Sequence, residues 1–556
     1  MKNSRARRVL RQHGPLGLLL AGSVVLRVMT QLAYQPALLY QGDSYGYLRL
    51  AQAPIPGHRV LGYPLFLRLV LGPSAPENIA SVSIVQHVLG LVVGVLIYVL
   101  LRHLDLAPVV AAAGAAPSLL DGYQIGIEQF ILAETVFTAM AVGAFVLLFW
   151  ESVGPAHAAA GSLLIAFSTL TRPAGIALFA PLLLYLVLRR ASFIAIATAA
   201  LSFVLPVAGY AAWFHDVEGS WRLSDYGPLF LYGRVAPFAS CDELDLTPAE
   251  RELCDPLPVD ERPRPDFYYW NPHSPIRDYW HLSPERRDRL YSSFASEVIR
   301  EQPLDYVRAV AADVYSYFLP QSWIGARASQ GPWRFKTTPP RYEPSPRRLE
   351  AFGGRPPPEL RINRDVVAVL RGYQRVVHTH GPLLAVALVL VLIACGVRPE
   401  PNRRDLRPEA AALALGGLGM LAVPAVTATY QYRYLIPSIP LLWVAGVLAG
   451  WHLHPGFGGV RRPPRLDPGQ AARLFIRWCW PSCCHIDEPP ARASTPGPRH
   501  GRHRCAPSRR SARSSGAGVR SSSSPSGRLP WQRAPKARFR SAGTERGIRW
   551  WMSYPP

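Results

Sequence analysis

Ten apolar runs occur along this chain, and they restrict it to folds that can sit in a lipid bilayer. Crossing the hydrocarbon core takes roughly 20 apolar residues, and most of the runs approach that length. The runs at 107–120 and 156–171 are short, so they are expected to tilt or to enter the membrane only in part. The sequence therefore predicts an all-α polytopic membrane protein with about ten transmembrane helices. The runs lie at 15–36, 79–101, 107–120, 130–150, 156–171, 174–188, 192–213, 380–397, 408–428 and 432–451.

Basic residues next to these runs predict the orientation of the helices. Lys and Arg are enriched in the cytoplasmic loops of membrane proteins. If the basic start MKNSRARRVLRQ is cytoplasmic, alternation over the ten spans also places Arg102, Arg189–Arg190 and RPEPNRRDLRPE (398–409) there. We therefore expect a multi-pass protein of the cell membrane with both termini in the cytoplasm.

Polar segments divide the chain into four predicted parts. The segment between the two groups of spans lies outside the cytoplasm by the same alternation, and we expect it to be an α-rich extracytoplasmic domain. The parts are an N-terminal transmembrane module (1–214), this extracytoplasmic domain (215–378), the C-terminal transmembrane helices (379–452) and a disordered basic tail (453–556).

The extracytoplasmic part shows a helical pattern and two cysteines. Apolar residues recur at helical spacing over 285–319, and the pattern breaks near Gln302–Pro303, which predicts two helices joined by a kink. Cys241 and Cys254 can form a disulfide if this part is outside the cytoplasm. The sequence alone does not decide whether they do.

The tail carries most of the net charge of +23, because it holds 20 Lys and Arg against 4 Asp and Glu. It is rich in Ser, Pro, Arg and Gly, a composition typical of disorder. Contact with anionic lipid head groups is one interpretation of its charge. The other is an extension of the reading frame that is irrelevant to the main activity. No nucleic-acid partner is predicted. The stretch WCWPSCCH lacks a second ligand pair at zinc-site spacing, so no metal site is predicted, and the sequence identifies no cofactor.

Ionisable residues gather at the predicted extracytoplasmic ends of several spans. Asp43 follows the first run, Glu134 opens a later one, and Arg172 and Arg433 stand where other spans begin or end. Ionisable groups at such depths are costly unless they reach water, pair with each other or serve a site. This shared position makes them candidates for a functional site.

Four stretches hold these residues in a fixed order, and together they resemble a known family. They are GDSYGYLRLAQ with PGHRVLGYPLFLRLVL (56–71), ILAETVFTAMAVGAFVLLF (131–149), STLTRPAGIALFAPLLLYLVLRR (168–190) and YQYRYLIPSIPLLWVAGVLAGW (430–451). They resemble the lipid-carrier-dependent membrane glycosyltransferases of the GT-C architecture, which include the protein O-mannosyltransferases and the aminoarabinose transferases acting on lipid A. The resemblance implies transfer of a sugar from a polyprenyl-phosphate donor to a lipid, glycan or protein acceptor of the cell envelope at the outer face.

The resemblance also implies that Asp43, the acid of the first outer loop, is the catalytic base. A carboxylate within reach of an acceptor hydroxyl can take its proton as the new bond forms. One position departs from the family, because the mannosyltransferases carry an Asp-Glu pair here and this chain has Asp43 and Ser44. The departure leaves the role of any second acid open.

Other residues of these motifs suit the remaining tasks of such a reaction. The leaving lipid phosphate needs a fixed cation, and Arg433 and Arg172 are the candidates because guanidinium groups bind phosphate with two hydrogen bonds. The predicted substrate-binding residues are the aromatics that could stack on a sugar, the pair that could line an acceptor groove, and one acid at the mouth of a span: Tyr45, Tyr47, His58, Arg59 and Glu134.

Each of these residues also has an ordinary structural interpretation. Asp43 can be a loop acid near a helix start, and Glu134 can favour a helix N-terminus through the dipole. Arg172 and Arg433 can be anchors that reach the head groups. The remaining acids of this face are Asp121 and Glu128, in the turn DGYQIGIEQ (121–129). We expect both to be solvated turn residues.

Two other classes of function stay open at this point. A transporter or flippase usually holds ionisable residues near the middle of the membrane and often has two related halves. A non-catalytic scaffold would use the part 215–378 to bind a partner of the cell envelope. A membrane glycosyltransferase explains the gathered Asp and Arg residues, which a scaffold leaves unexplained.

Overall fold

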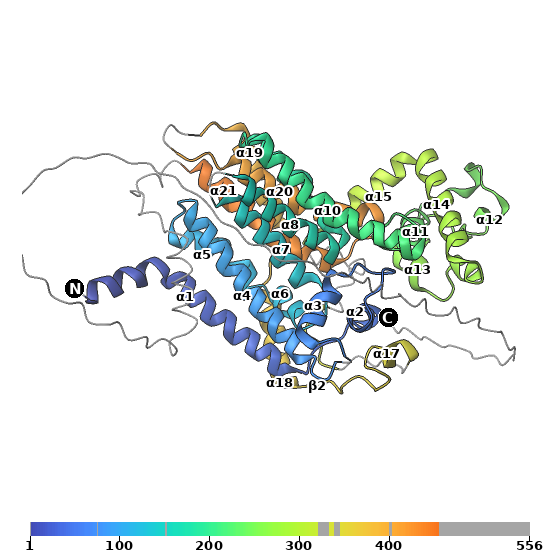
Figure 1. Ribbon diagram of the computed structural model, residues 1–556, viewed down its shortest axis with the longest axis horizontal. Coiled ribbons are helices and arrows are strands. Elements are labelled where there is room, and N and C mark those ends of the chain that lie inside the picture. Colours follow the sequence, from blue (N-terminus) through green and yellow to red (C-terminus); the bar gives the residue numbers. More distant parts are fainter. Residues whose placement is uncertain are drawn as a thin grey trace, which may run out of the picture. The chain divides into compact units, whose positions relative to one another are not determined.

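The computed structural model describes residues 2–74, 76–150, 153–320, 333–338, 345–399 and 403–454. The chain divides into two compact units, Met1–Ala471 and Ala472–Pro556, and every described residue belongs to the first. Helices make up nearly all of its regular structure (Figure 1). The predictions for the basic tail, including those for WCWPSCCH, lie outside the described residues.

Within these described ranges, six helical segments are long and apolar enough to cross a membrane, and four shorter apolar helices accompany them. The expectation of an all-α protein with several candidate membrane spans is confirmed, whereas the count of ten stays a prediction. The six segments are His13–Ala33, Ala80–His103, Phe193–Glu218, Arg364–Gly396, Arg407–Thr427 and Tyr432–Leu453; the shorter helices are Gly62–Leu71, Pro108–Leu120, Glu134–Phe149 and Pro173–Leu188.

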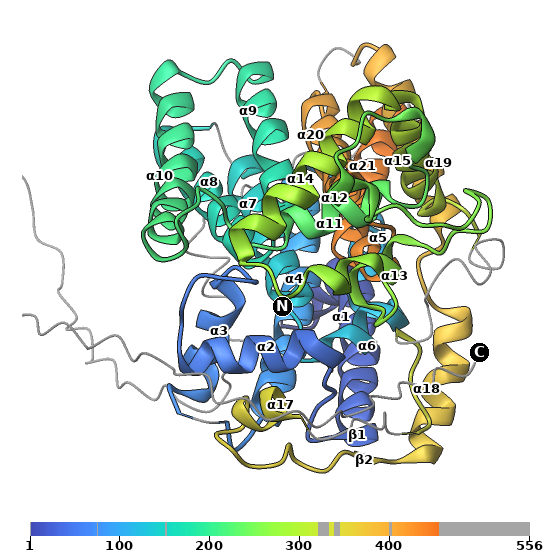
Figure 2. The same cartoon turned by 90° about the vertical axis from the view of Figure 1, so that its right-hand side faces the viewer.

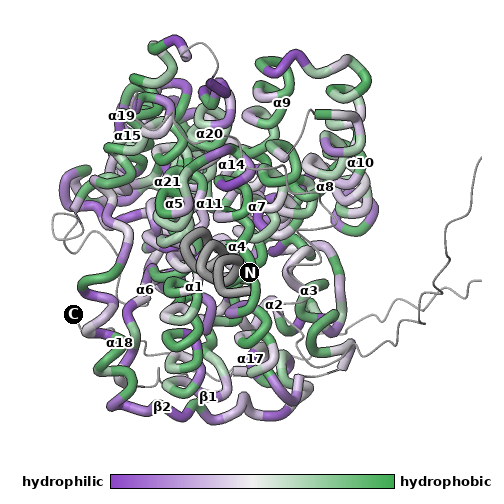
Figure 3. The backbone as a smooth tube through the Cα atoms, turned by 90° about the vertical axis from the view of Figure 1, so that its left-hand side faces the viewer, coloured by the Kyte–Doolittle hydropathy of each residue, from purple (hydrophilic) through white to green (hydrophobic). Residues whose placement is uncertain are grey.

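The apolar helices pack into one body around a shared core. Its helices are α1 (Lys2–Ala33), α4 (Ala80–His103), α5 (Pro108–Leu120), α7 (Glu134–Phe149), α8 (Pro155–Thr171), η1 (Pro173–Leu178), α9 (Phe179–Leu188), α10 (Phe193–Glu218), α19 (Gly381–Gly396), α20 (Arg407–Thr427) and α21 (Leu435–Leu453). α10 packs on α8, α8 on α7 and α7 on α4, while α19 and α20 both pack on α21. Figure 3 shows long hydrophobic stretches along these helices, as expected for segments that face lipid or each other.

Serine, glycine and proline mark the ends of the helices. The Ser192 hydroxyl caps α10 by accepting a hydrogen bond of 3.2 Å from the backbone N–H of Ala195. The same helix ends at Gly219, whose φ of +73° is a conformation that glycine adopts at little steric cost. α8 ends before Arg172 because Pro173 disfavours a helical conformation in the residue that precedes it. Arg172 is thereby fixed in extended backbone at a helix end.

A second group of helices forms the segment that the sequence assigned to the extracytoplasmic part, and it has its own apolar core. The break between α14 and α15 confirms the kink predicted near Gln302–Pro303, and the structure contains a disulfide between Cys241 and Cys254. Figure 2 faces this group, with α2 and α3 below it. The domain boundaries at 214, 378 and 452 stay a prediction. The elements are α11 (Gly227–Val235), η2 (Cys241–Glu243), α12 (Pro248–Arg251), α13 (Pro265–Trp270), η3 (Pro275–Tyr279), α14 (Pro284–Glu301) and α15 (Pro303–Ser316).

Short elements complete the described chain near the end of α1. Strand β1 (Tyr34–Gln35) pairs antiparallel with β2 (Arg361–Ile362), so the residues after α1 lie beside the segment that leads into α18. The remaining elements are α2 (Gln41–Gln52), α3 (Gly62–Leu71), α6 (Gly122–Glu128), α17 (Pro346–Glu350), α18 (Arg364–Val376) and η6 (Tyr432–Tyr434).

Candidate functional site

Five ionisable side chains from five separate elements meet beside α2. Asp43 lies in the first turn of α2, and Arg59 lies in the loop between α2 and α3. Glu134 opens α7, Arg172 follows α8, and Arg433 lies in η6, directly before α21. The sequence placed these residues on one face from their positions at span ends, and the structure brings them together.

Ion pairs connect these residues into one network, the arginine–acid cluster. Asp43 accepts hydrogen bonds from Arg59 Nη2 at 2.7 Å and from Arg433 Nη1 at 2.6 Å. Arg172 forms an ion pair with Glu134, whose Oε1 lies 3.9 Å from Arg433 Nε. The five groups are Asp43, Arg59, Glu134, Arg172 and Arg433. Three guanidinium groups against two carboxylates leave the cluster with one net positive charge.

Asp43 is held in its ionised form by this arrangement. Burial by itself would raise the pKa of Asp43, but the neighbouring charges of Arg59 and Arg433 outweigh it and lower that pKa below its usual range. The side chain keeps 17% of its surface exposed, so it remains accessible to a substrate. Each carboxylate oxygen has a second lone pair, so both can still accept a further hydrogen bond.

Aromatic rings surround the guanidinium group of Arg433. Its Cζ lies 5.1 Å from the ring centre of Tyr40, 5.3 Å from that of Tyr434 and 5.7 Å from that of Trp333. The Cζ of Arg172 lies 5.2 Å from the ring centre of the same Tyr434. Such cation–π contacts hold the charge in place without neutralising it. The rings therefore leave the positive charge available to an incoming anion.

The backbone that carries Asp43 is fastened by the residue that follows it. Ser44 is fully buried; its hydroxyl donates to the Ile131 carbonyl at 2.9 Å and accepts from the Tyr40 N–H at 2.8 Å. The loop before α2 also pairs with this segment, because the Leu38 N–H donates to the Gln129 carbonyl at 3.0 Å. Ser44 thus occupies a closed position, in which its hydroxyl both donates and accepts a hydrogen bond and fastens the first turn of α2.

The remaining predicted substrate-binding residues lie around the cluster in different ways. Tyr47 packs against Arg59, with 5.0 Å between the guanidinium and the ring, and is largely buried. Tyr45 packs instead against Phe352, and Arg348 lies over its ring. Neither tyrosine ring offers an open stacking face comparable to that of an exposed aromatic.

His58 is drawn away from the cluster toward the second group of helices. Its Nδ1 lies 2.8 Å from an Asp225 oxygen, and its ring stacks on Tyr226 at 4.7 Å. The adjacent Arg59 turns the other way, to Asp43. Of the two residues predicted to line an acceptor groove, Arg59 therefore belongs to the cluster, whereas His58 contacts Asp225 and Tyr226.

The prediction that Asp121 and Glu128 are solvated turn residues is wrong. Both are buried, with exposed fractions of 2% and 0%. Asp121 caps α6 by accepting hydrogen bonds from the backbone N–H groups of Tyr123 and Gln124, and it also accepts one from the Thr379 N–H at 2.6 Å. The turn is buried because α6 is covered by neighbouring helices, a tertiary effect that its polar sequence does not reveal.

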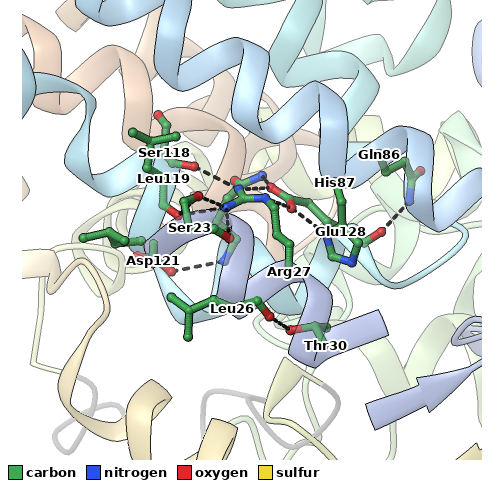
Figure 4. A network of polar contacts seen from close by, with 12 residues as sticks. Ser23, Leu26, Arg27, Thr30, Gln86, His87, Ser118, Leu119, Asp121 and Glu128 are labelled. Carbon is green, nitrogen blue, oxygen red and sulfur yellow. Dashed lines mark hydrogen bonds and ion pairs between the residues drawn. The ribbon is translucent and has the colours of Figure 1, made fainter. Parts of the chain in front are cut away.

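Glu128 is the centre of a second, buried network (Figure 4). Arg27 of α1 donates to both of its oxygens at 2.8 Å, and His87 Nδ1 of α4 lies 2.9 Å from Oε2. Gly90 leaves the space that this carboxylate occupies, since a Cβ there would lie 2.1 Å from Oε1. A buried carboxylate is tolerated only when it is paired and hydrogen-bonded in this way.

The buried network fixes the segment against which α2 is held. His87 Nε2 lies 2.9 Å from the Gln129 side-chain oxygen, and Gln86 donates to the carbonyls of Glu128 and Phe130 at 2.8 and 2.7 Å. This segment ends at Ile131, the residue that accepts the Ser44 hydrogen bond. The two networks are therefore joined through the backbone of 128–131.

Sequence reasoning missed Asp266, an acid that α13 brings to the edge of the cluster. The Gln431 amide donates to its carboxylate at 3.4 Å, two residues from Arg433 in the chain. Burial raises the pKa of Asp266 more than its contacts with Gln431 and Arg433 lower it. The surrounding stretch DFYYW was noticeable only for its aromatic residues, and no sequence signal links it to η6.

Metal binding has no support from the described part of the chain. No three His, Cys, Asp or Glu side chains among the described residues are grouped so as to hold a metal ion. The cysteines of the tail lie outside those residues. The cluster's own chemistry, two carboxylates with three guanidinium groups, favours an anionic ligand.

Comparisons with known proteins give one distant structural likeness. No protein-family model and no curated protein matches the chain. Solved structures that resemble it include two of the oligosaccharyltransferase AglB of Archaeoglobus fulgidus, one tethered to an acceptor peptide with an NVT sequon and one in complex with an inhibitory peptide and a dolichol-phosphate. In both, the TM-score is 0.35 and the identity 12%, over 84% of this chain and 54% of theirs.

An apo structure of the same archaeal enzyme matches with a TM-score of 0.32 and 11% identity. The chain spans about half the length of these proteins. This likeness is too distant to support a fold or a function for this chain.

Proposed function

We propose that this protein is a multi-pass membrane glycosyltransferase that moves a sugar from a polyprenyl-phosphate donor to an acceptor of the cell envelope. The observation that carries the proposal is the arginine–acid cluster, in which two carboxylates and two further guanidinium groups surround Arg433. The candidate span Tyr432–Leu453 and the shorter apolar helix Glu134–Phe149 both begin at this cluster, so a lipid-borne donor would be able to reach it from the bilayer. The outer face of the membrane, with both termini in the cytoplasm, is the orientation that the basic loops favour.

Arg433 and Arg172 are the proposed ligands of the donor phosphate. Arg433 is bound to Asp43 through Nη1, and aromatic rings hold its position. Arg172 faces it across Glu134. Guanidinium groups stay charged at any physiological pH and bind phosphate oxygens in pairs. The two arginines can therefore stabilise the negative charge that develops on the phosphate when the sugar leaves.

Asp43 is the proposed general base. The acceptor oxygen forms a bond to the anomeric carbon while the bond from that carbon to the phosphate oxygen breaks. The acceptor proton passes to Asp43, and the electron pair of the broken bond leaves with the lipid phosphate. A lone pair of the Asp43 carboxylate remains free to accept that proton even with both arginines bound.

Donor binding would make Asp43 a stronger base than it is in the free protein. The donor is a phosphodiester with one negative charge, so its arrival reduces the net charge of the cluster from one positive charge to none. A weaker positive field lets the pKa of Asp43 rise toward its ordinary value. The free protein thus keeps the carboxylate ionised, and the bound donor prepares it for proton transfer.

Sugar transfer from membranes that contain the wild-type protein or Asp43→Asn tests the proposal. The donors are a panel of radiolabelled polyprenyl-phosphate sugars, and Asp305→Asn is the matched control because Asp305 is an exposed acid of α15 paired only with Arg308. Transfer by wild type and by Asp305→Asn, and not by Asp43→Asn, would support the proposal. Transfer that survives Asp43→Asn would refute the base, and no transfer from any donor by folded protein would refute the activity.

A transporter or flippase is the second candidate, and the buried pair of Arg27 and Glu128 favours it. Ionisable residues inside a helical membrane body often mark a transport path. In this protein, however, both Glu128 oxygens are bound by Arg27 and one also by His87, which is the arrangement of a structural pair. Uptake of a lipid-linked sugar into sealed vesicles, unchanged by Asp43→Asn, would favour this candidate.

A further inference from the structure

A cavity of about 210 Å³ lies apart from the arginine–acid cluster and is lined almost entirely by donors of hydrogen bonds. α18 and the residues just after it supply one wall, α6 supplies Tyr123, and the segment 333–338 supplies Arg334. The lining residues are Tyr123, Arg334, Arg371, Gln374, Arg375 and His378. The lining contains three arginines and no acid, so the cavity suits an anion.

The wall from α18 has the spacing of one helix face. Arg371 and Arg375 are four residues apart in α18, so the two lie on the same side of the helix, and His378 follows just after the helix ends at Val376. Gln374 lies between them and is held by its own hydrogen bonds, because its amide donates to the Gly122 carbonyl at 3.0 Å. Arg371 and Arg375 are thus positioned by α18, which is hydrogen-bonded to α6.

The charges of this cavity are not neutralised by the rest of the described protein. Within the described ranges, no carboxylate lies within ion-pair distance of the three arginines. Asp121, the nearest acid of α6, is occupied by backbone N–H groups of Tyr123, Gln124 and Thr379. Three guanidinium groups without an ion-pair partner among the described residues lie around one small space, and an anion between them would offset their mutual repulsion.

The position of the cavity indicates that its ligand belongs to the membrane. α18 ends at Val376 and α19 begins at Gly381, and both lie within the candidate span Arg364–Gly396. Val369 and Val376 of α18 are exposed, at 60% and 75%, which suits a helix that lies at a lipid surface. The cavity volume of about 210 Å³ suits a phosphate or diphosphate group and is too small for a folded peptide.

We infer that this cavity binds the phosphate group of a membrane lipid. Arginine recognises phosphate through paired, charge-assisted hydrogen bonds, and three of them around one cavity define a phosphate site rather than a site for a neutral sugar. This binding does not depend on sugar transfer.

Aromatic side chains connect the lining of the cavity to the arginine–acid cluster. The ring of Tyr123 packs edge-on against Tyr432 at 4.8 Å, next to Arg433 in the chain. Trp333, the neighbour of Arg334, approaches Arg433 from the other side.

Calorimetric titration of the full-length protein in neutral detergent tests this inference. The probes are a short-chain phosphatidic acid, the matching phosphatidylcholine, inorganic phosphate and pyrophosphate. We expect phosphatidic acid to bind and Arg371→Gln/Arg375→Gln to weaken it about ten- to a hundredfold, because two charged hydrogen-bond donors are lost. The matched control Arg300→Gln/Arg308→Gln, at two exposed arginines of α14 and α15, should bind like wild type.

Each other outcome has a defined meaning. If only inorganic phosphate or pyrophosphate binds, and does so through Arg371 and Arg375, the cavity is a site for a soluble phosphate and the lipid assignment is refuted. If the double variant binds phosphatidic acid as wild type does, or if wild type binds no probe, the whole inference is refuted. Arg375→Gln alone, at an exposed position, provides a milder variant should the double variant unfold.

The assay also separates this inference from the proposed function. Asp43→Asn should bind phosphatidic acid like wild type, since Asp43 is not in the lining. Intact lipid binding in a protein that transfers no sugar would refute only the proposed activity. Sugar transfer by a protein that binds no phosphate-bearing probe would refute only the cavity.

Discussion

Arg433 donates a hydrogen bond of 2.6 Å to Asp43, a residue 390 positions away in the chain. The contact joins the first short helix after α1 to the turn that opens the last membrane helix. It thereby fixes the proposed base against the proposed phosphate ligand. Because neither residue moves independently of the other, substitutions at Arg433 should affect both donor binding and proton transfer.

Replacing Arg433 by lysine is expected to lower sugar transfer strongly although the charge is kept. Lysine is a point charge on a flexible chain and cannot bind Asp43 and a phosphate at once with fixed geometry. We expect kcat/KM for the donor to fall by about a hundredfold or more, the loss seen when one charge-stabilising donor is removed from an active site. In Arg433→Gln, which also removes the charge, kcat/KM for the donor should fall further. Both values are measured with saturating acceptor.

The matched control for this substitution is Arg300→Lys, at an exposed arginine of α14. It should leave kcat/KM unchanged. If Arg433→Lys retained full activity, the guanidinium geometry would have no role and Arg433 would be an interface anchor, the alternative that the sequence left open.

Ser44 is expected to act as a positioning residue for Asp43. Ser44→Ala removes two buried hydrogen bonds, leaving the Tyr40 N–H without its acceptor, and should cost about 1–3 kcal/mol of unfolding free energy. Ser44→Thr keeps the hydroxyl and should restore much of both the stability and the value of kcat. A thermal unfolding series together with kcat for the three proteins would check this.

A structural role alone would change stability without changing the chemistry. Ser81→Ala removes an exposed hydroxyl that bonds only to Asn78, so it serves as the control. If kcat at a temperature where all variants are folded were equal for Ser44→Ala and wild type, Ser44 would have no influence on the position of Asp43.

The membrane helices and most members of the cluster could be predicted from the sequence, because both depend on local signals. An apolar run of membrane length is visible without knowledge of its neighbours, and Asp43, Arg172 and Arg433 stand beside such runs. Pro173 even marks the helix end at which Arg172 is exposed to the site. These three residues stand at the predicted extracytoplasmic ends of their runs and were therefore expected to lie close together, and they do.

The parts that the sequence did not reveal depend on tertiary packing. Glu128 looks like a turn acid, yet Arg27, about 100 residues earlier, reaches it inside the helical body. Asp266 comes from a different segment of the fold and has no motif of its own. Likewise, Tyr45 belongs to the motif but faces Phe352, because neighbouring residues of a helix point in different directions.

The buried pair of Arg27 and Glu128 should be important for folding. Glu128→Gln leaves the Arg27 guanidinium without a counter-charge in an apolar interior, and such a change typically costs about 3–5 kcal/mol. We expect a large loss of thermal stability in detergent. Glu301→Gln, at an exposed acid that ends α14, should change stability by less than about 0.5 kcal/mol.

A milder variant distinguishes the pair itself from its position. Gly90→Ala keeps both charges but places a methyl group where the Glu128 carboxylate lies, so it should also destabilise the protein. Gly372→Ala, at a helix position with open space around it, is its control. Equal stability of Gly90→Ala and wild type would show that this network is free to rearrange.

The acid limb of the pH–rate profile should differ between kcat/KM and kcat. In the free protein, Arg59 and Arg433 hold the pKa of Asp43 below its usual range, so the carboxylate is ionised at any pH above about 4. A depressed pKa also means that the stability it contributes is present above the pKa of the unfolded chain, about 3.9, and is lost as the pH falls through the lower value in the folded protein. The folded protein therefore should not lose this contribution in mildly acidic buffer.

When the donor phosphate occupies Arg433 and Arg172, the pKa of Asp43 should rise, because part of the positive field is neutralised. The profile of kcat/KM reports groups of the free enzyme and that of kcat reports groups of the complex, so the acid limb of kcat should lie at higher pH than that of kcat/KM. In steady-state rates between pH 4 and 8, kcat/KM should show no acid limb from Asp43, whereas kcat should fall toward pH 4, with Asp305→Asn as the control that changes neither profile. If kcat and kcat/KM kept the same profile over this range, donor binding would leave the proton affinity of Asp43 unchanged, and the donor phosphate would then have to bind away from Arg433.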